Sequence, residues 1–527
     1  MTRPAGGAFT GTGALLRLAL RRDRLRIGIW VLVLTSTMAY TPGALRLAYP
    51  DEAQRLARVD LLATPAGIML SGPTFGMNET DLGVMVANEL TLTMVVATSI
   101  LSILTVIRHT RADEENGSAE LVMSSVTGRH ARTTTALLLA GGLNAILALA
   151  MTTAMSTAGF GVLDSAAMCL GITAVATVFG VFAAVTAQLW RQARTATGAA
   201  MAVLAVAVLV RGVGDVIDHS GSTLSWFSPI AWAQQMRPFV DLRWWPFAML
   251  LVLAIGLTTV AAALEHRRQY DAGIVAATGE QPDAPAVTGP LALHLRLQRG
   301  QTVGWSIGLF AAGLVFGSMT KSLLDTARDN ELVARVLAAT GYDGVYTTMT
   351  QFLAAAAAAY VAAAVLRVRA EEQSGLAEPI LAGAVSRWHW LLTAMYAALA
   401  GAAVLMLCAG LGHGVGAGLA LGEPDTILRL VLAALAQLPA LAVVTAVAAL
   451  AVALRAPWIA WLAVTFVIAA LYLGALLRLP DWLIELSPVS QTTVPQEFPT
   501  GALVVMLVAA TIVAFAAGWI YRRRDAA

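Results

Sequence analysis

Residues 165–190 read SAAMCLGITAVATVFGVFAAVTAQLW, a stretch of 26 residues without Asp, Glu, Lys or Arg. Asp164 precedes it and Arg191 follows it. An α-helix needs about 20 apolar residues to cross the hydrocarbon core of a bilayer, so this stretch is long enough to span a membrane. It lacks the alternation of apolar and polar residues that is typical of a barrel strand. In lipid, the other structure that makes all its backbone hydrogen bonds is the α-helix. We therefore expect a transmembrane helix here.

Eleven further runs free of charged residues lie on either side of it. They comprise residues 27–45, 90–107, 133–163, 195–210, 244–264, 300–320, 344–366, 388–422, 430–454, 456–477 and 498–521. The run 195–210 is short for a span, whereas 133–163 and 388–422 are long enough to include interfacial turns. The chain is thus expected to be an all-α polytopic membrane protein with about 12 transmembrane helices.

The composition agrees with a membrane protein and disfavours other classes. Of 527 residues, 58% are hydrophobic and 13% are charged, against about 25% charged residues in an average soluble domain. The net charge of +2 is not gathered into a basic stripe that would bind nucleic acid. Cys169 and Cys408 lie inside apolar runs, which favours ordinary core positions over a disulfide or a metal site.

The placement of arginine orients the chain. If the N-terminus is cytoplasmic, the segments on that side carry 23 Arg, against 11 Lys and Arg on the other side. This bias predicts that both termini are cytoplasmic. Lys321 is the only lysine, which is typical of a GC-rich bacterial genome and so indicates a bacterial cell membrane. Residues 15–22, LLRLALRR, fit either an amphipathic helix on the inner face or a basic flank that only fixes orientation.

A charged loop occurs twice in the sequence. RADEENGSAELV at residues 111–122 is followed by arginine at 129, and RAEEQSGLAEPI at residues 369–380 is followed by arginine at 387. The two copies align without gaps at an offset of 258 residues. The identical pairs include Arg111 with Arg369, Glu114 with Glu372, Gly117 with Gly375, Glu120 with Glu378, and Arg129 with Arg387.

A second repeat sits before the last run of each half. Ser228-Pro229 recurs as Ser487-Pro488 at an offset of 259 residues. Two repeats at nearly one offset predict tandem halves of six spans in parallel orientation, arranged with pseudo-twofold symmetry. We place these halves at residues 1–271 and 291–527. The segment 272–290, rich in Ala, Gly and Pro, is expected to be a cytoplasmic linker.

The repeated loop favours a short amphipathic helix in the cytoplasm. Apolar residues follow each glutamate at helical spacing, and Pro379 suits the first turn of a helix. Glu120 and Glu378 would lie at a helix N-terminus, where the helix dipole favours a carboxylate. Such a helix can seat in a groove of a soluble partner. The same pattern also fits a solvated helix that merely joins two spans.

The pattern Arg-x-x-Glu-x-x-Gly-x-x-Glu, with an apolar helix and a basic residue after it, resembles the first cytoplasmic loop of type-two ABC exporter permeases. Over its whole length the chain resembles the fused twelve-span permeases of actinobacterial polyketide or tetronasin-type antibiotic exporters. The resemblance implies that the loops contact a separate ABC ATPase, in two copies, which carries the ATP and Mg²⁺. Carried over to this sequence, the ATPase-coupling residues are Glu114, Glu115, Gly117, Glu120, Arg129, Glu372, Gly375, Glu378 and Arg387.

The resemblance also implies short re-entrant helices on the outer side before the last span of each half. Ser228, Pro229, Ser487 and Pro488 would belong to them. The second loop departs from the first in having Pro379 where the first has Leu121, so the two ATPase contacts are expected to be unequal.

The sequence gives little support for catalysis or ATP hydrolysis by this chain itself. A phosphate-binding P-loop needs glycine before its lysine, and Thr320 precedes Lys321, so ATP hydrolysis is expected on another chain. His389 and His413 are the deepest ionisable candidates in the runs, and we expect both at the interface. The glycines at 410, 412, 414, 416 and 418 are expected to bend a helix end or permit close packing. No metal cluster or nucleophile–base pair stands out.

The expected function is therefore export of hydrophobic, antibiotic-like compounds by a transporter subunit that is not an enzyme. An ion-coupled secondary transporter with twelve spans is the alternative, and the scarcity of charge in the runs disfavours it. A membrane enzyme would need polar catalytic groups, for which the sequence offers no constellation. The segment 46–83 is expected to be a connecting loop, or a small external cap.

Overall fold

A computed structural model describes residues 7–63, 65–73, 75–76, 81–117, 127–268, 273–275, 288–329, 331–473, 480–492 and 500–524. These residues form helices and turns, without a strand among them. Two compact units are present, Met1–Ala284 and Pro285–Ala527. Eleven helices within the described part are long and apolar enough to cross a membrane. The prediction of an all-α polytopic membrane protein is confirmed.

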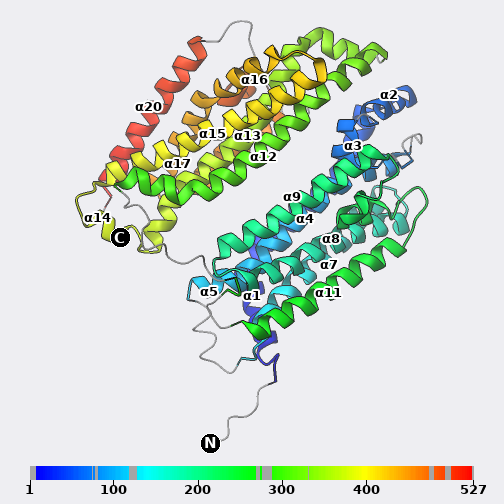
Figure 1. Cartoon of the computed structure of the whole chain (residues 1–527), viewed down its shortest axis with the longest axis horizontal. Helices are drawn as coiled ribbons and strands as arrows, with labels where there is room; N and C mark the ends of the chain where they lie inside the picture. The colour runs from blue at the N-terminus through cyan, green and yellow to red at the C-terminus, as the bar shows by residue number, and fades with distance from the viewer. Residues whose placement is uncertain are drawn as a thin grey trace, which may run out of the picture. The chain divides into compact units, whose positions relative to one another are not determined.

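The first unit contains six of these long helices. Its elements are α1 (Thr12–Ala48), α2 (Glu52–Leu62), α3 (Pro65–Ser71), α4 (Leu82–Ile107), the π-helix η1 (Arg108–Ala112), α5 (Asp113–Glu115), α7 (Ala131–Thr157), α8 (Val162–Leu189), α9 (Ala193–Ile217), the 3₁₀ turn η2 (Ser225–Phe227), α10 (Pro229–Gln234) and α11 (Trp245–Arg267). In Figure 1, α4, α7, α8 and α11 run side by side.

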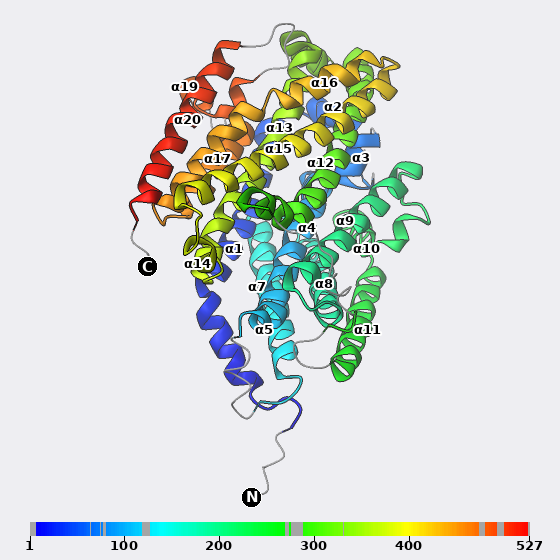
Figure 2. The same cartoon turned by 60° about the vertical axis from the view of Figure 1, so that its left-hand side comes forward.

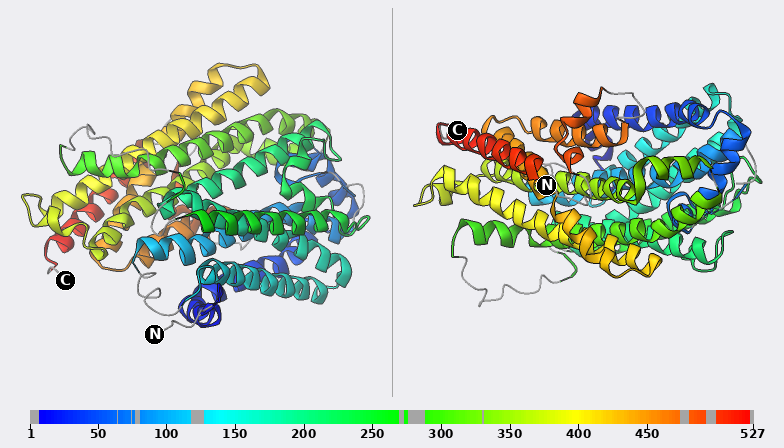
Figure 3. Two further views of the ribbon diagram at one scale, coloured as in Figure 1. Left: turned by 60° about the horizontal axis from the view of Figure 1, so that its bottom comes forward. Right: turned by 90° about the horizontal axis from the view of Figure 1, so that it is seen from above.

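The second unit holds the remaining elements. They are α12 (Pro290–Asp329), α13 (Glu331–Gln373), α14 (Glu378–Leu381), α15 (Arg387–Leu421), α16 (Asp425–Leu435), α17 (Leu438–Ala453), α18 (Trp458–Leu473), α19 (Asp481–Glu485), the 3₁₀ turn η3 (Pro488–Gln491) and α20 (Thr500–Arg522). The run 456–477 corresponds to α18, whose apolar part is shorter than a full span. In Figure 3 the red α20 lies against the orange α17.

The first helix differs from the amphipathic segment considered above for residues 15–22. α1 is one continuous helix of 37 residues, so these residues are its first turns and not a separate surface helix. Asp23 within it is buried, and it pairs with His109 at 2.7 Å and Arg108 at 3.1 Å. Arg22 adds a 2.8 Å ion pair to Asp113. The ion pairs of Asp23 and Arg22 hold α1 to η1 and α5. Figure 2 shows α1 beside α7.

The core of the first unit contains a small polar network among apolar side chains. Asn144 of α7 donates to Ser102 of α4 at 3.1 Å and to Thr177 of α8 at 3.0 Å. A buried amide in a membrane helix is stable only when its hydrogen bonds are made, and here they join three helices. This network fixes how α4, α7 and α8 pack.

The segment 46–83 is more than a connecting loop. It contains α2 and α3, and the buried Arg211 of α9 donates to the carbonyl oxygen of Ile68 at 3.2 Å and to that of Met69. Arg211 also pairs with Asp215 at 3.3 Å, and Asp215 accepts a 2.6 Å hydrogen bond from Ser225. The segment is thus pinned to α9, and Ser225 of η2 bonds to the same helix.

Glycines allow two helices of the second unit to touch through their backbones. A Cβ atom on Gly313 or Gly317 of α12 would overlap the α15 backbone, and one on Gly412 or Gly416 would overlap the α12 backbone. The prediction of close packing for the glycine set is confirmed. α15 is a single 35-residue helix that ends at Gly422, where φ is +75°.

The interfacial position expected for His413 stays a prediction. Its side chain is buried, 3.5 Å from the hydroxyl of Thr350 and edge-on to the ring of Tyr346. His413 precedes the end of α15 by eight residues, about 12 Å along the helix axis. His389, near the start of α15, is exposed.

Candidate functional site

The two repeated loops begin with the same turn. In the first unit α4 continues through η1 and α5, and the chain turns at Gly117, where φ is +71°. In the second unit α13 ends and the chain turns at Gly375, where φ is +74°. The Gly117 N–H donates to the backbone carbonyl oxygen of Glu114, and the Gly375 N–H donates to that of Glu372, each at 3.1 Å. Glycine recurs because a side chain is strained in this left-handed conformation.

Glu114 lies at the centre of a cluster of arginines. Its carboxylate pairs with Arg132 at 3.0 Å and with Arg111 and Arg268 at shorter range. The side chain of Glu114 is only 5% exposed, so a partner protein has little of it to touch. Arg132 opens α7 and Arg268 follows α11, so the carboxylate ties the loop to both helices.

Glu372 makes the equivalent connection in the second unit. Its carboxylate accepts a hydrogen bond from the Tyr521 hydroxyl and pairs with Arg524 at 3.3 Å. Tyr521 lies in the last turn of α20, and Arg524 follows that helix. In both units the repeated glutamate therefore bonds to an arginine just beyond the final long helix.

The repeated arginines bind the ends of the same two helices. Arg129 donates to the carbonyl oxygens of Glu265 and His266 at 3.1 and 2.6 Å, in the last turn of α11. Arg387 donates to the carbonyl oxygen of Arg524, directly after α20. The last carbonyls of a helix lack helical partners and attract cations. We call each glutamate–arginine pair, together with its contacts at the end of the final helix, a loop clamp.

The clamp of the first unit encloses a polar cavity of about 280 Å³. Glu114, Arg129, Arg132, Glu265 and Arg268 line it. Glu265 accepts hydrogen bonds from Thr133 at 2.6 Å and lies 2.5 Å from a ring nitrogen of His130. Carboxylates and guanidinium groups are thus paired across its walls.

The other coupling residues lie at the surface of their loops. Glu115 is exposed and accepts a 3.1 Å hydrogen bond from the Ala193 N–H, so it caps the start of α9. Glu378 is exposed and begins α14, with Pro379 in its first turn. α14 ends at Leu381, so it is shorter than the amphipathic helix expected there. Glu120 lies outside the described residues.

Both Ser-Pro repeats start a short helical segment. Ser228 is buried, and its hydroxyl accepts a 3.3 Å hydrogen bond from the Ile230 N–H, with Pro229 in the first turn of α10. Ser487 is buried and precedes η3, which Pro488 opens. The segments differ in kind, since α10 is an α-helix and η3 is a 3₁₀ turn.

Four side chains of the two clamps were missed by sequence reasoning: Arg132, Arg268, Tyr521 and Arg524. From the sequence, Arg524 contributed only to the prediction that the C-terminus is cytoplasmic, because arginines at the end of a span usually fix its orientation. A signal was present, since basic residues follow the last run of both halves at nearly one offset. Among the described residues no cluster of His, Cys, Asp or Glu could hold a metal ion.

Comparison with known proteins agrees with the fold. The family model described as "Multidrug efflux system permease Rv1217c, C-terminal domain" matches residues 16–265 and 287–522. The chain is 38% identical over 501 residues to the multidrug efflux system permease protein Rv1217c of Mycobacterium tuberculosis, covering 92% of this chain and 89% of that protein. The many apolar helices and this similarity make the chain a multi-pass membrane protein, and it belongs to the Rv1217c-like family of multidrug efflux permeases.

Proposed function

We propose that this chain is the membrane subunit of an ABC-type exporter that expels hydrophobic, antibiotic-like compounds. A separate ATPase, in two copies, binds the two repeated loops from the cytoplasm, where both termini of the permease also lie. ATP and Mg²⁺ are bound by the ATPase. Membership of a multidrug efflux permease family supports export, and the duplicated loop supports two ATPase contacts.

The observation that carries the proposal is the occurrence of the same loop clamp in both units. Each loop continues from a long helix, α4 or α13, and is bonded to the end of the last long helix, α11 or α20. A displacement of the loop by a bound protein is therefore passed to two membrane helices at once. A loop that only joined two spans would not need the same contacts twice.

The clamp glutamates transmit this displacement, and exposed residues of the loop make the contact. In the second loop Leu376 is 69% exposed, beside the exposed Glu378 and Pro379. An exposed apolar side chain beside a short helix can seat in a hydrophobic groove of a partner protein. Coupling residues thus divide into partly buried transmitters, such as Glu372, and surface contacts, such as Glu378.

The proposal is tested by co-purification of the full chain with a candidate ABC ATPase. Leu376→Asp should abolish recovery of the ATPase, because a charge replaces the apolar anchor. Leu419→Asp is the matched control, since Leu419 is 79% exposed near the other end of α15 and should leave recovery unchanged. Recovery of the ATPase with Leu376→Asp at the wild-type level would refute the contact.

An ion-coupled secondary transporter is the second candidate, and one observation favours it. His413 is buried within a span, where titratable groups often serve ion pathways. This function predicts that efflux survives ATP depletion and stops when the proton gradient is collapsed. The exporter proposal predicts the reverse, so measuring efflux from cells under each condition separates the two.

A further inference from the structure

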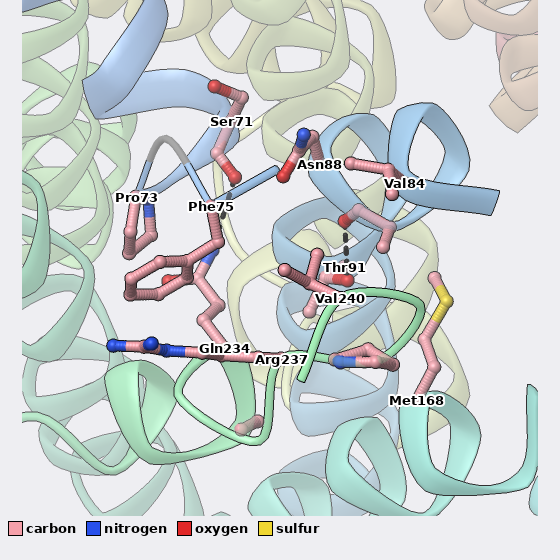
Figure 4. Close-up of a pocket in the computed structure, with 13 residues that line it drawn as sticks. Ser71, Pro73, Phe75, Val84, Asn88, Thr91, Met168, Gln234, Arg237 and Val240 are labelled. Atoms are coloured by element: carbon pink, nitrogen blue, oxygen red, sulfur yellow. Dashed lines mark hydrogen bonds between the residues drawn. The ribbon is translucent and has the colours of Figure 1, made fainter. Parts of the chain in front are cut away.

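The pocket in Figure 4 is too small to hold a ligand much larger than water. It lies between the loop after α3, the first turns of α4, and α10, and its volume is about 30 Å³, room for roughly two water-sized groups. A larger molecule would need an open surface, and α1 offers one. In the membrane-spanning stretch of α1, 17% of the residues are buried, against 72% in α4. Most of that stretch is therefore open to lipid.

α1 is longer than the hydrocarbon core is thick, so its first turns lie outside the core. Its 37 residues extend about 55 Å, whereas the core measures about 30 Å. The charge-free run 27–45 extends about 28 Å and so fills the core. Arg21 and Arg24 precede this run by about 9 and 5 Å. The headgroup layer adds about 5–8 Å on each side of the core, so both side chains reach it.

Arg21 and Arg24 can hold one phosphate group between them. They lie one turn apart on the same side of α1, where the Cβ atoms of residues i and i+3 are about 5–6 Å apart. Both are exposed, and neither forms an ion pair with an acid in the described part of the chain. Arg22 differs, since it pairs with Asp113 at 2.8 Å. A guanidinium group presents several N–H donors to phosphate oxygens, so two of them on one face suit a phosphate.

The same face of α1 continues toward the bilayer core as an apolar surface with a gap in it. Leu25 is 75% exposed and Leu32 is 67% exposed. Gly28 lies between them, and a Cβ atom there would meet nothing within 4 Å. At 100° per residue, these three positions and the two arginines fall within about 100° of the helix circumference. A lipid whose phosphate contacts the arginines can therefore lay an acyl chain over Gly28.

A matching face occurs on α12, the first long helix of the second unit. Arg296 and Arg299 are exposed, lie one turn apart, and match the arginine pair of α1 at an offset of 275 residues. Val303 and Ile307 follow on the same side of α12 and are 51% and 66% exposed. The positive-inside effect counts arginines near a span whichever face they occupy. It does not account for a pair on one exposed, lipid-ready face in both units.

We propose that each of these two faces binds one anionic phospholipid. The lipid phosphate accepts hydrogen bonds from both guanidinium groups of the pair, and one acyl chain lies along the exposed apolar positions that follow. A phospholipid with net negative charge is preferred over phosphatidylcholine, whose choline cation offsets the charge of its phosphate. On another side of α1, Arg22 bonds to Asp113 at the first repeated loop, so the lipid stabilises α1 beside that loop. The binding requires no ATPase and goes beyond the proposed export function.

The test uses the purified full chain in dodecyl maltoside, an uncharged detergent, without an ATPase. Native mass spectrometry with dioleoyl phosphatidylglycerol should show two tightly retained lipids per chain, and fewer with dioleoyl phosphatidylcholine. Arg21→Gln/Arg24→Gln should retain one, and so should Arg296→Gln/Arg299→Gln. The affinity of the altered site should fall about 25-fold, since each arginine near a lipid headgroup contributes about fivefold. Arg21→Lys/Arg24→Lys keeps the charge and should retain both lipids.

Arg522→Gln/Arg523→Gln is the matched control, because it also removes two exposed arginines at the end of a span. These two are consecutive, so their side chains diverge, and Arg523 already lies 3.7 Å from the centre of the Trp519 ring. The control should retain both lipids. All variants should keep the wild-type Tm without added lipid, since the replaced side chains are exposed. Inorganic phosphate and glycerol 3-phosphate lack acyl chains and should not displace the lipids at equal concentration.

Four results would overturn the inference about the two arginine faces. The wild type could retain both phospholipids equally, or the two double variants could retain as much phosphatidylglycerol as the wild type. The control could lose as much lipid as they do, or the soluble phosphates could displace the lipid. A clear fall in the Tm of either double variant would contradict the exposed, unpaired positions of its arginines.

Discussion

Glu114 and Arg268 lie 154 residues apart in the sequence, and their side chains pair beneath the first repeated loop. Glu372 and Arg524, 152 residues apart, form the corresponding pair in the second unit. Each pair connects a loop to the end of the last long helix of its unit. The two pairs differ in surroundings, because Glu114 has three arginine partners and Glu372 has one arginine and a tyrosine.

This difference predicts unequal effects of removing the two carboxylates. Glu114→Gln leaves Arg111, Arg132 and Arg268 without their shared countercharge in a buried site, which should cost about 3 kcal/mol of unfolding free energy. Glu372→Gln should cost about 1 kcal/mol, because Arg524 is partly exposed and keeps its hydrogen bond to Val452. Thermal unfolding of the purified full chain in detergent measures both. Equal or reversed losses would contradict the assigned geometry.

The turn glycines predict a second pair of effects. Gly375→Ala places a Cβ atom at a positive φ and should destabilise the loop by about 1 kcal/mol, whereas Gly375→Asn should be milder because asparagine tolerates this conformation. Gly142→Ala in α7 is the control, since its Cβ atom would meet open space in a helix and should be neutral or stabilising. Limited proteolysis of the loop region reports the change. Protection of Gly375→Ala equal to the wild type would argue against the turn.

Close packing of α12 and α15 predicts a severe effect of a single side chain. Gly412→Leu forces its side chain into the α12 backbone near Phe310, so folded protein should be lost or its Tm sharply lowered. Gly304→Leu, on α12 where a Cβ atom meets nothing within 4 Å, should fold normally. Size-exclusion profiles of detergent extracts compare the two. A monodisperse Gly412→Leu protein with wild-type stability would disprove the backbone contact.

The polar network of the first unit predicts a moderate loss. Asn144→Val removes the hydrogen bonds from Asn144 to Ser102 and Thr177, and should cost about 1–2 kcal/mol. Thr153→Val on the same helix is the control, because the exposed Thr153 bonds only within its own helix, to Leu149. Thermal unfolding of both variants gives the comparison. A larger loss for Thr153→Val would show that the network does not hold the helices together.

Much of this fold could be predicted from sequence because a bilayer imposes a simple rule on its spans. Runs without charge marked the long helices, and the repeat marked the two loops and their glycines. Neither the charge-free runs nor the repeat could predict contacts between distant segments. Examples are the pair of Glu114 with Arg268 and the glycine faces through which α12 and α15 touch. The burial of Asp23 in α1 and of His413 in α15 depends on how the helices pack. Neither is visible in a pattern of hydrophobicity.

The central claim is that the loop clamps transmit a displacement of the loops, caused by the bound ATPase, to the final long helix of each unit. The most direct measurement is ATP hydrolysis by the ATPase bound to the Glu114→Gln/Glu372→Gln double variant in nanodiscs. We predict that the ATPase still co-purifies, because exposed residues make the contact, and that stimulation of hydrolysis by the permease falls about tenfold. Stimulation equal to that of the wild-type permease, with the complex intact, would contradict the claim.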